Sequence, residues 1–91
     1  MSKLTMTMRH TVQDYRKWRP VFDGDVGRQK AAGLVNLAVY RSADDNNVVL
    51  ITWDVEDRQK AEEFVASPVL QAAMKQAGVV GTPEVSFQLV G

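Results

Sequence analysis

The feature that most constrains the fold is a pair of apolar segments, residues 34–41 and 48–55, separated by the polar turn Asp-Asp-Asn-Asn at residues 44–47. Both segments are rich in β-branched and aromatic residues, which favour strands. Asp and Asn hydrogen-bond nearby backbone groups in turns. The two segments are therefore predicted to form a β-hairpin.

Both hairpin strands are apolar on each of their alternating faces. The first strand is predicted to place Val35, Leu37 and Val39 on one face and Leu34, Asn36, Ala38 and Tyr40 on the other. The second places Val49, Ile51, Trp53 and Val55 opposite Val48 and Leu50. Helices cover only one face of such a sheet, so the other apolar face needs a cover. The simplest cover is a second copy of the chain, and we expect a homodimer; the alternative is a partly exposed binding surface.

A helical segment is predicted before the hairpin. Asp14 is a good N-cap, and Gly33 suits the position that follows the last helical residue. Pro20 lies inside this segment and has no backbone N–H to donate. We therefore expect a kink or a restart of the helix near residues 18–20.

A second helical segment is predicted after the hairpin. Asp57 can cap it, and Ser67 followed by Pro68 predicts a restart because proline is favoured at the first helical position. Gly78 is expected to end this segment. The Gly-Thr-Pro run at residues 81–83 is then predicted to be a connector.

The outer strands complete the order β-α-β-β-α-β. Residues 4–10 and 85–89 alternate in polarity, as half-buried strands do. Lys-Ala-Ala-Gly-Leu-Val at residues 30–35 is echoed by Lys-Gln-Ala-Gly-Val-Val at residues 75–80, which supports two βαβ halves. Right-handed crossovers then give a single α+β domain over residues 1–91. It is predicted to be ferredoxin-like, a four-stranded antiparallel sheet with two helices on one face.

The composition argues against several classes of function. Eleven basic and eleven acidic residues balance, whereas nucleic-acid and membrane surfaces call for clustered positive charge. There is no cysteine and one histidine, which excludes thiolate chemistry and argues against a metal site. No secretory leader or membrane-spanning segment is recognisable, so a cytoplasmic location is expected.

Two stretches carry a resemblance to a known group of proteins. They are His-Thr-Val-Gln-Asp-Tyr-Arg-Lys-Trp-Arg-Pro-Val-Phe-Asp at residues 10–23 and Ser-Pro-Val-Leu-Gln-Ala-Ala-Met-Lys-Gln-Ala-Gly-Val at residues 67–79. Both resemble the dimeric α/β-barrel superfamily of antibiotic-biosynthesis-monooxygenase-like proteins, and most closely its "cyclase-like" bacterial members. The resemblance implies a homodimeric barrel with a small-molecule cavity between sheet and helices in each subunit. Some members are monooxygenases of polycyclic aromatic substrates that need no cofactor, so none is expected here; others degrade haem or isomerise lactones.

His10 and Asp23 are the candidate catalytic residues. His10 ends the first predicted strand, and a neutral imidazole facing the helices there can act as a general base near pH 7. The alternative is a histidine that only hydrogen-bonds a helix terminus. Asp23 could pair with His10, or it could close the helical turn before Gly24.

Five residues are candidates for ligand binding. Tyr15, Trp18 and Phe22 recur at helical spacing and suggest an aromatic wall for a flat ligand, with plain core packing as the alternative. Trp53 is a further large ring beside the core. Asn36 is the one polar residue on its strand face, and it is expected either to bond across the hairpin or to point into a cavity.

Three functional hypotheses follow. The first is a monooxygenase-like enzyme acting on an aromatic or polyketide-like small molecule. The second is a non-catalytic ligand-binding or sensor dimer that uses the same cavity. The third is a purely structural dimer with a filled core. A cavity lined by His10, Trp18 and a second polar group supports either of the first two, whereas a solid interior supports the third.

Overall fold

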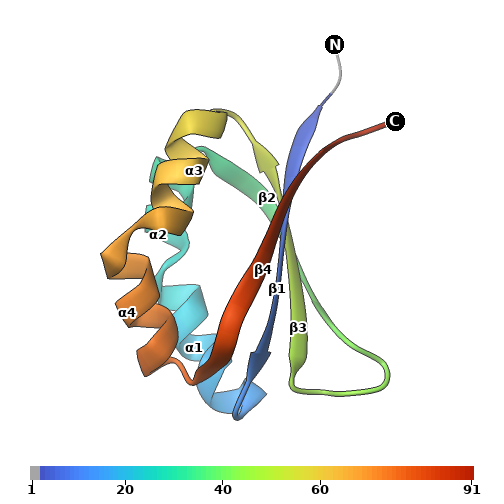
Figure 1. The fold of residues 1–91 in the computed structure, drawn as a ribbon, viewed down its shortest axis with the longest axis vertical. Helices are drawn as coiled ribbons and strands as arrows, with labels where there is room; N and C mark the ends of the chain where they lie inside the picture. Colours follow the sequence, from blue (N-terminus) through green and yellow to red (C-terminus); the bar gives the residue numbers. More distant parts are fainter. Residues whose placement is uncertain (1–2) are drawn as a thin grey trace.

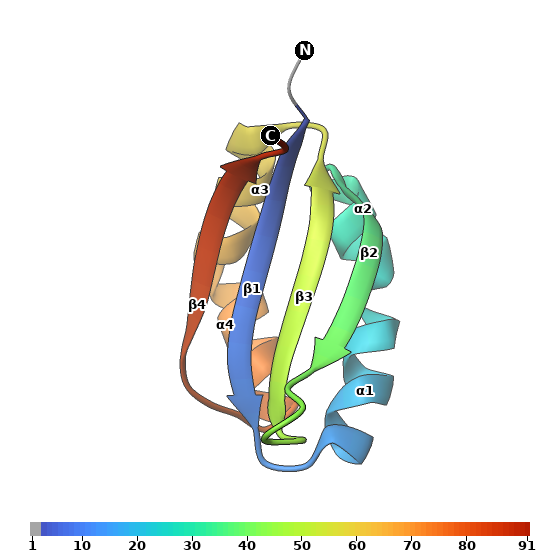
Figure 2. The same ribbon diagram turned by 90° about the vertical axis from the view of Figure 1, so that its right-hand side faces the viewer.

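Four strands form one antiparallel sheet, and the helices lie against one of its faces (Figure 1). The computed structural model describes residues 3–91. The elements in chain order are β1 (Leu4–Val12), α1 (Tyr15–Gly24), α2 (Val26–Ala31), β2 (Leu34–Arg41), β3 (Val48–Val55), α3 (Arg58–Ala66), α4 (Pro68–Gln76) and β4 (Val79–Leu89). Figure 2 shows the strand order β2-β3-β1-β4. This arrangement confirms the predicted ferredoxin-like α+β fold. Within residues 3–91, no helix is long and apolar enough to cross a membrane.

The predicted helix boundaries are set by the residues that the sequence indicated. The side chains of Asp14, Asp57 and Ser67 accept hydrogen bonds from the backbone N–H groups of Arg16, Lys60 and Val69, at 2.9, 3.1 and 3.2 Å. Pro68 occupies the first turn of α4. Gly33 and Gly78 follow α2 and α4 with φ angles of 77° and 85°, a left-handed conformation that glycine adopts at little cost.

The first helical segment restarts later than predicted. α1 continues through Pro20 to Gly24, and the interruption falls at Asp25, before α2 begins. Proline removes one intrahelical hydrogen bond, but residues around Pro20 are exposed enough for water to serve the freed carbonyl. Gly24 has poor helix propensity and lies at the actual break. The expectation of a restart near residues 18–20 was therefore wrong.

A bulge in β2 corrects the predicted faces of the hairpin. The register with β3 shifts between Val35 and Ala38, and Asn36 there has a φ of 52°, which asparagine tolerates better than most residues. One extra residue reverses the alternation of side chains beyond it. Leu34 is therefore buried in the core, and Val35 shares the opposite face with Ala38.

β4 begins earlier than predicted. Gly81, Thr82 and Pro83 were expected to form a connector, but they lie within the strand. Pro83 is tolerated there because β4 is an edge strand, where a missing donor breaks no inner ladder. Arg9 of β1 pairs with Glu84, and Thr11 pairs with Val80. β4 therefore advances four residues, from Val80 to Glu84, where β1 advances two. The extra residues form a bulge in β4 beside His10.

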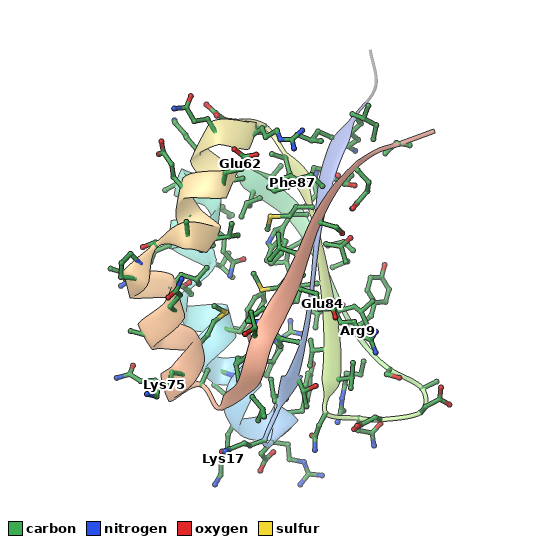
Figure 3. The ribbon with its side chains drawn as sticks, viewed as in Figure 1. Arg9, Lys17, Glu62, Lys75, Glu84 and Phe87 are labelled. Carbon is green, nitrogen blue, oxygen red and sulfur yellow. The ribbon has the colours of Figure 1, made fainter. Side chains whose placement is uncertain are left out.

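The core fills the space between the sheet and the helices. Its most completely buried large side chains are Trp18, Met6, Leu34, Ile51, Val12 and Val49. Figure 3 shows Phe87 of β4 directed towards the helices, whereas Arg9 and Glu84 extend from the opposite face. The inward-facing apolar side chains of the strands thus form one layer, with His10 as a polar member on β1.

The face of the sheet away from the helices is divided into two halves. Its β1–β4 half is polar and carries Thr5, Thr7, Arg9, Thr11, Glu84, Ser86 and Gln88. Its β2–β3 half carries five apolar residues, Val35, Ala38, Tyr40, Val48 and Leu50, beside the polar residues Asn36, Thr52 and Asp54. We refer to the five apolar residues as the outer apolar patch. The expectation that the two hairpin strands are apolar on both faces is thus confirmed at these five positions, with Leu34 and Val35 exchanged, whereas Thr52 and Asp54 make the outer face of β3 mixed.

Candidate functional site

His10 lies on the inner face of β1 and is 5% exposed. Neither of its ring nitrogens has a hydrogen-bond partner among residues 3–91. Burial lowers the pKa of His10 from 6.5 to about 4, so the ring is neutral at pH 7. Buried polar atoms are nearly always paired in folded proteins, and an unpaired pair of ring nitrogens points to a functional role.

A small cavity adjoins His10. Its free volume is about 40 Å³, and its walls come from β1, β3 and all four helices. This volume has room for water but not for an aromatic ligand, since drug-sized ligands occupy pockets of about 300 Å³ or more. The predicted gap between the sheet and the first helix therefore exists, but it is nearly closed.

Aromatic rings form one wall of this cavity. Trp18 meets His10 edge-on, with ring centroids 5.4 Å apart and planes at 71°. Phe22 stacks on Trp18 at 4.7 Å and approaches Trp53 at 6.4 Å. These four rings line the cavity together, so the predicted wall is assembled from α1, β1 and β3. Offset and edge-on contacts of this kind are favourable packing in their own right.

Gln29 supplies a second polar group of the cavity and was not among the residues predicted from the sequence. Its side chain is 2% exposed, and its Oε1 accepts a hydrogen bond from Trp53 Nε1 at 3.1 Å. The amide –NH₂ of Gln29 remains available as a donor. The spacing of Trp18, Phe22 and Gln29, four and then seven residues, places all three on one helical face and could have revealed it.

Tyr15 and Asp23 lie outside the cavity. Tyr15 Oη accepts a hydrogen bond from Arg19 Nη1 at 3.2 Å, and the Arg41 guanidinium lies 3.9 Å from the centre of its ring. Asp23 accepts a hydrogen bond from Arg19 Nε at 2.9 Å at the surface. The structure therefore does not bring Asp23 to His10, and Asp23 instead closes a helical turn with Arg19.

Asn36 lies on the outer side of the sheet. Its Nδ2 donates to Asp54 Oδ2 at 2.8 Å, and Lys3 Nζ lies 2.8 Å from the same oxygen. These bonds, that from Lys3 first, lower the pKa of the Asp54 carboxyl. The expected bond across the hairpin is confirmed. The sheet separates Asn36 from the cavity beside His10, so the alternative placement in that cavity was wrong.

A larger groove lies between α4 and β4. We call it the α4–β4 groove; its volume is about 500 Å³. It is lined by Met8, Val65, Gln71, Met74, Lys75, Val79, Gly81, Thr82, Pro83 and Val85. Met8 and Met74 also line the cavity beside His10. The groove and the cavity are therefore neighbours that share two methionine side chains.

Acidic and imidazole groups do not gather in this part of the molecule. Within residues 3–91, no three His, Cys, Asp or Glu side chains lie close enough together to hold a metal ion. The chemistry available at the cavity is that of one neutral imidazole, one amide, the Asp25 carboxylate and several aromatic rings.

These features define the class: a ferredoxin-like α+β protein with a buried, unpaired histidine beside an aromatic-walled cavity. The sequence matches no protein-family model and no curated protein. Solved structures do match it, and the resemblance to antibiotic-biosynthesis-monooxygenase-like proteins is confirmed at the level of the fold.

Three solved structures illustrate the likeness. A Bordetella bronchiseptica protein provisionally named an antibiotic biosynthesis monooxygenase has a TM-score of 0.77 and 17% identity, over 97% of this chain and 96% of its own. SnoaB, a cofactor-independent oxygenase from Streptomyces nogalater, has a TM-score of 0.67 and 19% identity, over 100% and 95%. The ActVA-Orf6 monooxygenase of Streptomyces coelicolor, solved with the ligand nanaomycin D, has a TM-score of 0.64 and 16% identity, over 99% and 88%.

Proposed function

We propose that this chain binds a flat, hydroxylated aromatic small molecule beside His10 and oxidises it with molecular oxygen, without a cofactor. The observation that carries the proposal is the buried imidazole of His10, which lines a cavity walled by aromatic rings and whose two nitrogens have no hydrogen-bond partner among residues 3–91. A phenolic ligand would supply the missing hydrogen bond. The fold shared with SnoaB and ActVA-Orf6, described as an oxygenase and a monooxygenase, supports the reaction type.

The reaction that fits this site begins with the transfer of a proton from the ligand to His10. The neutral His10 accepts a hydrogen bond from a ligand hydroxyl, and it takes the proton as negative charge develops on the ligand. The resulting electron-rich ring reacts with O₂; in an anthrone, the ring CH₂ becomes C=O, O₂ supplies the new oxygen, and the second oxygen leaves as water. Trp18 and Phe22 would hold the ring flat against the wall.

The lowered pKa of His10 favours a second candidate function. A group with a pKa of about 4 is a weak base, and proton removal becomes favourable only when the ligand's negative charge stabilises the imidazolium. A protein that only binds the ligand, as a carrier or sensor, needs His10 solely as a hydrogen-bond acceptor. Turnover distinguishes the two functions.

The test uses one substrate and one stable analogue. With 1,8-dihydroxyanthrone, oxygen uptake above the spontaneous rate is expected for the natural protein and is expected to be lost in His10→Ala. Binding of 1,8-dihydroxyanthraquinone is followed by quenching of Trp18 and Trp53, the two tryptophans of the chain, both in the cavity wall. Binding without oxygen uptake supports the carrier or sensor. Failure of both ligands to bind at micromolar concentration contradicts the proposed site and favours a structural role.

The homodimer is part of the same proposal. The outer apolar patch exposes Tyr40, which is 57% accessible, beside Leu50. Apolar side chains on a sheet face without helices favour a second sheet as cover. Two chains packed in this way would form a barrel with the helices outside and one cavity in each subunit.

A further inference from the structure

The cavity beside His10 is too small for the ligand that the proposed function requires. Its free volume is about 40 Å³. Two ligand-sized spaces adjoin it: the α4–β4 groove of about 500 Å³, and a surface hollow of about 440 Å³ that shares Phe64 and Leu70 with the cavity. A flat ligand can reach His10 through the groove only if the groove and the cavity join. The question is therefore which side chains separate them.

Met8 of β1 and Met74 of α4 are the two side chains that line both the cavity beside His10 and the α4–β4 groove. Met8 is 4% exposed, and Met74 is partly buried against the core. Methionine is unbranched and has three rotatable side-chain bonds, so it changes shape at low energetic cost. Because both methionines lie between the groove and the cavity, a change in their rotamers is the smallest movement that we expect to join the two spaces.

The bulge of β4 explains why the groove exists at this place. β4 departs from β1 between Val80 and Glu84, directly beside His10. The bulged residues Gly81, Thr82 and Pro83 form the outer wall of the groove. Bulges occur often beside functional sites, where they open space or redirect a side chain.

We propose that the α4–β4 groove is the access path and the outer half of the ligand site, with Met74 and Met8 closing it from His10. The inference rests on the proposed function for the identity of the ligand. Lys75 is the single charged residue of the groove lining, and Gln71 and Thr82 add polar groups. The ligand is therefore a flat aromatic molecule whose hydroxylated ring reaches His10 and whose outer end is neutral or anionic.

A second opening competes with this path. Val21 and Asp25, near the end of α1, also line the cavity beside His10, and Val21 is 44% exposed. A ligand passing between α1 and α4 would cross Val21 and leave the groove unused. The two paths make opposite predictions for substitutions at Val21 and in the groove.

Stopped-flow quenching of the tryptophans by 1,8-dihydroxyanthraquinone separates the paths. Gln71→Phe narrows the groove without touching the inner cavity, and it is expected to lower the association rate about fivefold. Met74→Ala removes the partition and is expected to raise that rate by a similar factor. Gln76→Phe, at an exposed position of α4 that lines none of these spaces, is the matched control and is expected to leave the rate unchanged. A rate lowered by Val21→Phe and unaffected by Gln71→Phe would overturn the proposal.

A probe that needs no specific ligand separates failure of this inference from failure of the proposed function. Acrylamide is small and neutral and quenches tryptophan by collision. Met74→Ala is expected to increase acrylamide quenching of the unliganded protein, while Gln76→Phe leaves it unchanged. If the anthraquinone never binds but this increase is seen, the path exists and the ligand class is wrong. If Met74→Ala leaves the quenching unchanged, Met74 does not close the path.

Discussion

The indole N–H of Trp53 donates to the Oε1 of Gln29 across 3.1 Å in the core. This bond joins β3 to α2 behind the cavity and fixes the orientation of the Gln29 amide. Without its acceptor, the buried indole N–H would keep its desolvation penalty and lose its partner.

Replacing Gln29 by Leu is therefore expected to destabilise the protein. The expected loss in the free energy of unfolding is about 1–3 kcal/mol, the usual result of leaving one buried donor unpaired. Urea denaturation followed by circular dichroism measures it. The double variant Gln29→Leu with Trp53→Phe removes donor and acceptor together, and it is expected to show a coupling energy between the two sites. Additive losses would show that the bond contributes nothing beyond packing.

Replacing His10 by Leu is expected to have opposite effects on stability and binding. The imidazole is buried with both nitrogens unpaired among residues 3–91, so an apolar side chain of similar size removes a desolvation penalty. The free energy of unfolding is expected to rise by about 1 kcal/mol, whereas affinity for 1,8-dihydroxyanthraquinone is expected to fall about tenfold.

The control for this exchange is Met6→Leu, a volume-conserving change in the same strand that is expected to alter neither quantity by much. A strongly destabilised His10→Leu protein would indicate that His10 holds the core together, contrary to a functional role for the ring.

The lowered pKa of His10 predicts a specific loss of stability in acid. Above pH 6.5 the ring is neutral in both the folded and the unfolded chain, and it contributes no pH dependence. Between pH 6.5 and about 4 the unfolded chain binds a proton that the folded chain does not, so stability falls as the pH falls. The fall ends below the folded-state pKa, and its upper limit is about 3 kcal/mol.

The measurement compares urea denaturation at pH 7.5 and pH 4.5 for the natural chain and for His10→Leu. Carboxylates titrate in both proteins and cancel in the difference. The natural chain is expected to lose more stability than the variant over this range. Equal losses would mean that the folded protein protonates His10 as readily as the unfolded chain.

The fold was predictable because local signals and the apolar pattern agreed. The caps at Asp14, Asp57 and Ser67 and the left-handed glycines at positions 33 and 78 mark helix ends by short-range physics that needs no tertiary information. The hairpin and its turn follow from the same kind of local pattern. These signals fix the element order, and the order restricts the topology to few choices.

The two bulges were not predictable by this reasoning, because a regular alternation was assumed throughout each strand. Asn36 gives little warning, since asparagine is common in ordinary turns as well as in bulges. The Gly-Thr-Pro run at 81–83 has the composition of a loop, and only the edge position of β4 permits it inside a strand.

The site was predictable in its residue types and less so in its geometry. His10, Trp18, Phe22 and Trp53 meet around one cavity because they lie on inward-facing positions that periodicity identifies. Asp23, in contrast, forms an ion pair with Arg19, which lies one helical turn before it. This local ion pair is favoured over a more distant contact with His10. Gln29 could be assigned to the same helical face as Trp18 and Phe22 only by continuing the helical periodicity across the break at Asp25.

The outer apolar patch predicts where the proposed dimer can be disrupted. Leu50 lies at the centre of the patch on β3, beside Arg9 of β1, which cannot neutralise an added positive charge. Leu50→Lys places a charge in the interface of both subunits, and it is expected to weaken dimerisation roughly a hundredfold. Sedimentation equilibrium is expected to return twice the 10.1 kDa chain mass for the natural protein and a single chain mass for the variant at micromolar concentration.

The matched variant is Val69→Lys, an exposed apolar residue exchanged for the same charge on the helical layer. It is expected to remain a dimer, because the proposed interface involves the sheet and not α4. Dissociation by Val69→Lys but not by Leu50→Lys would move the interface to the helices. A natural chain that sediments as a monomer would show that the outer apolar patch is not covered by a second copy.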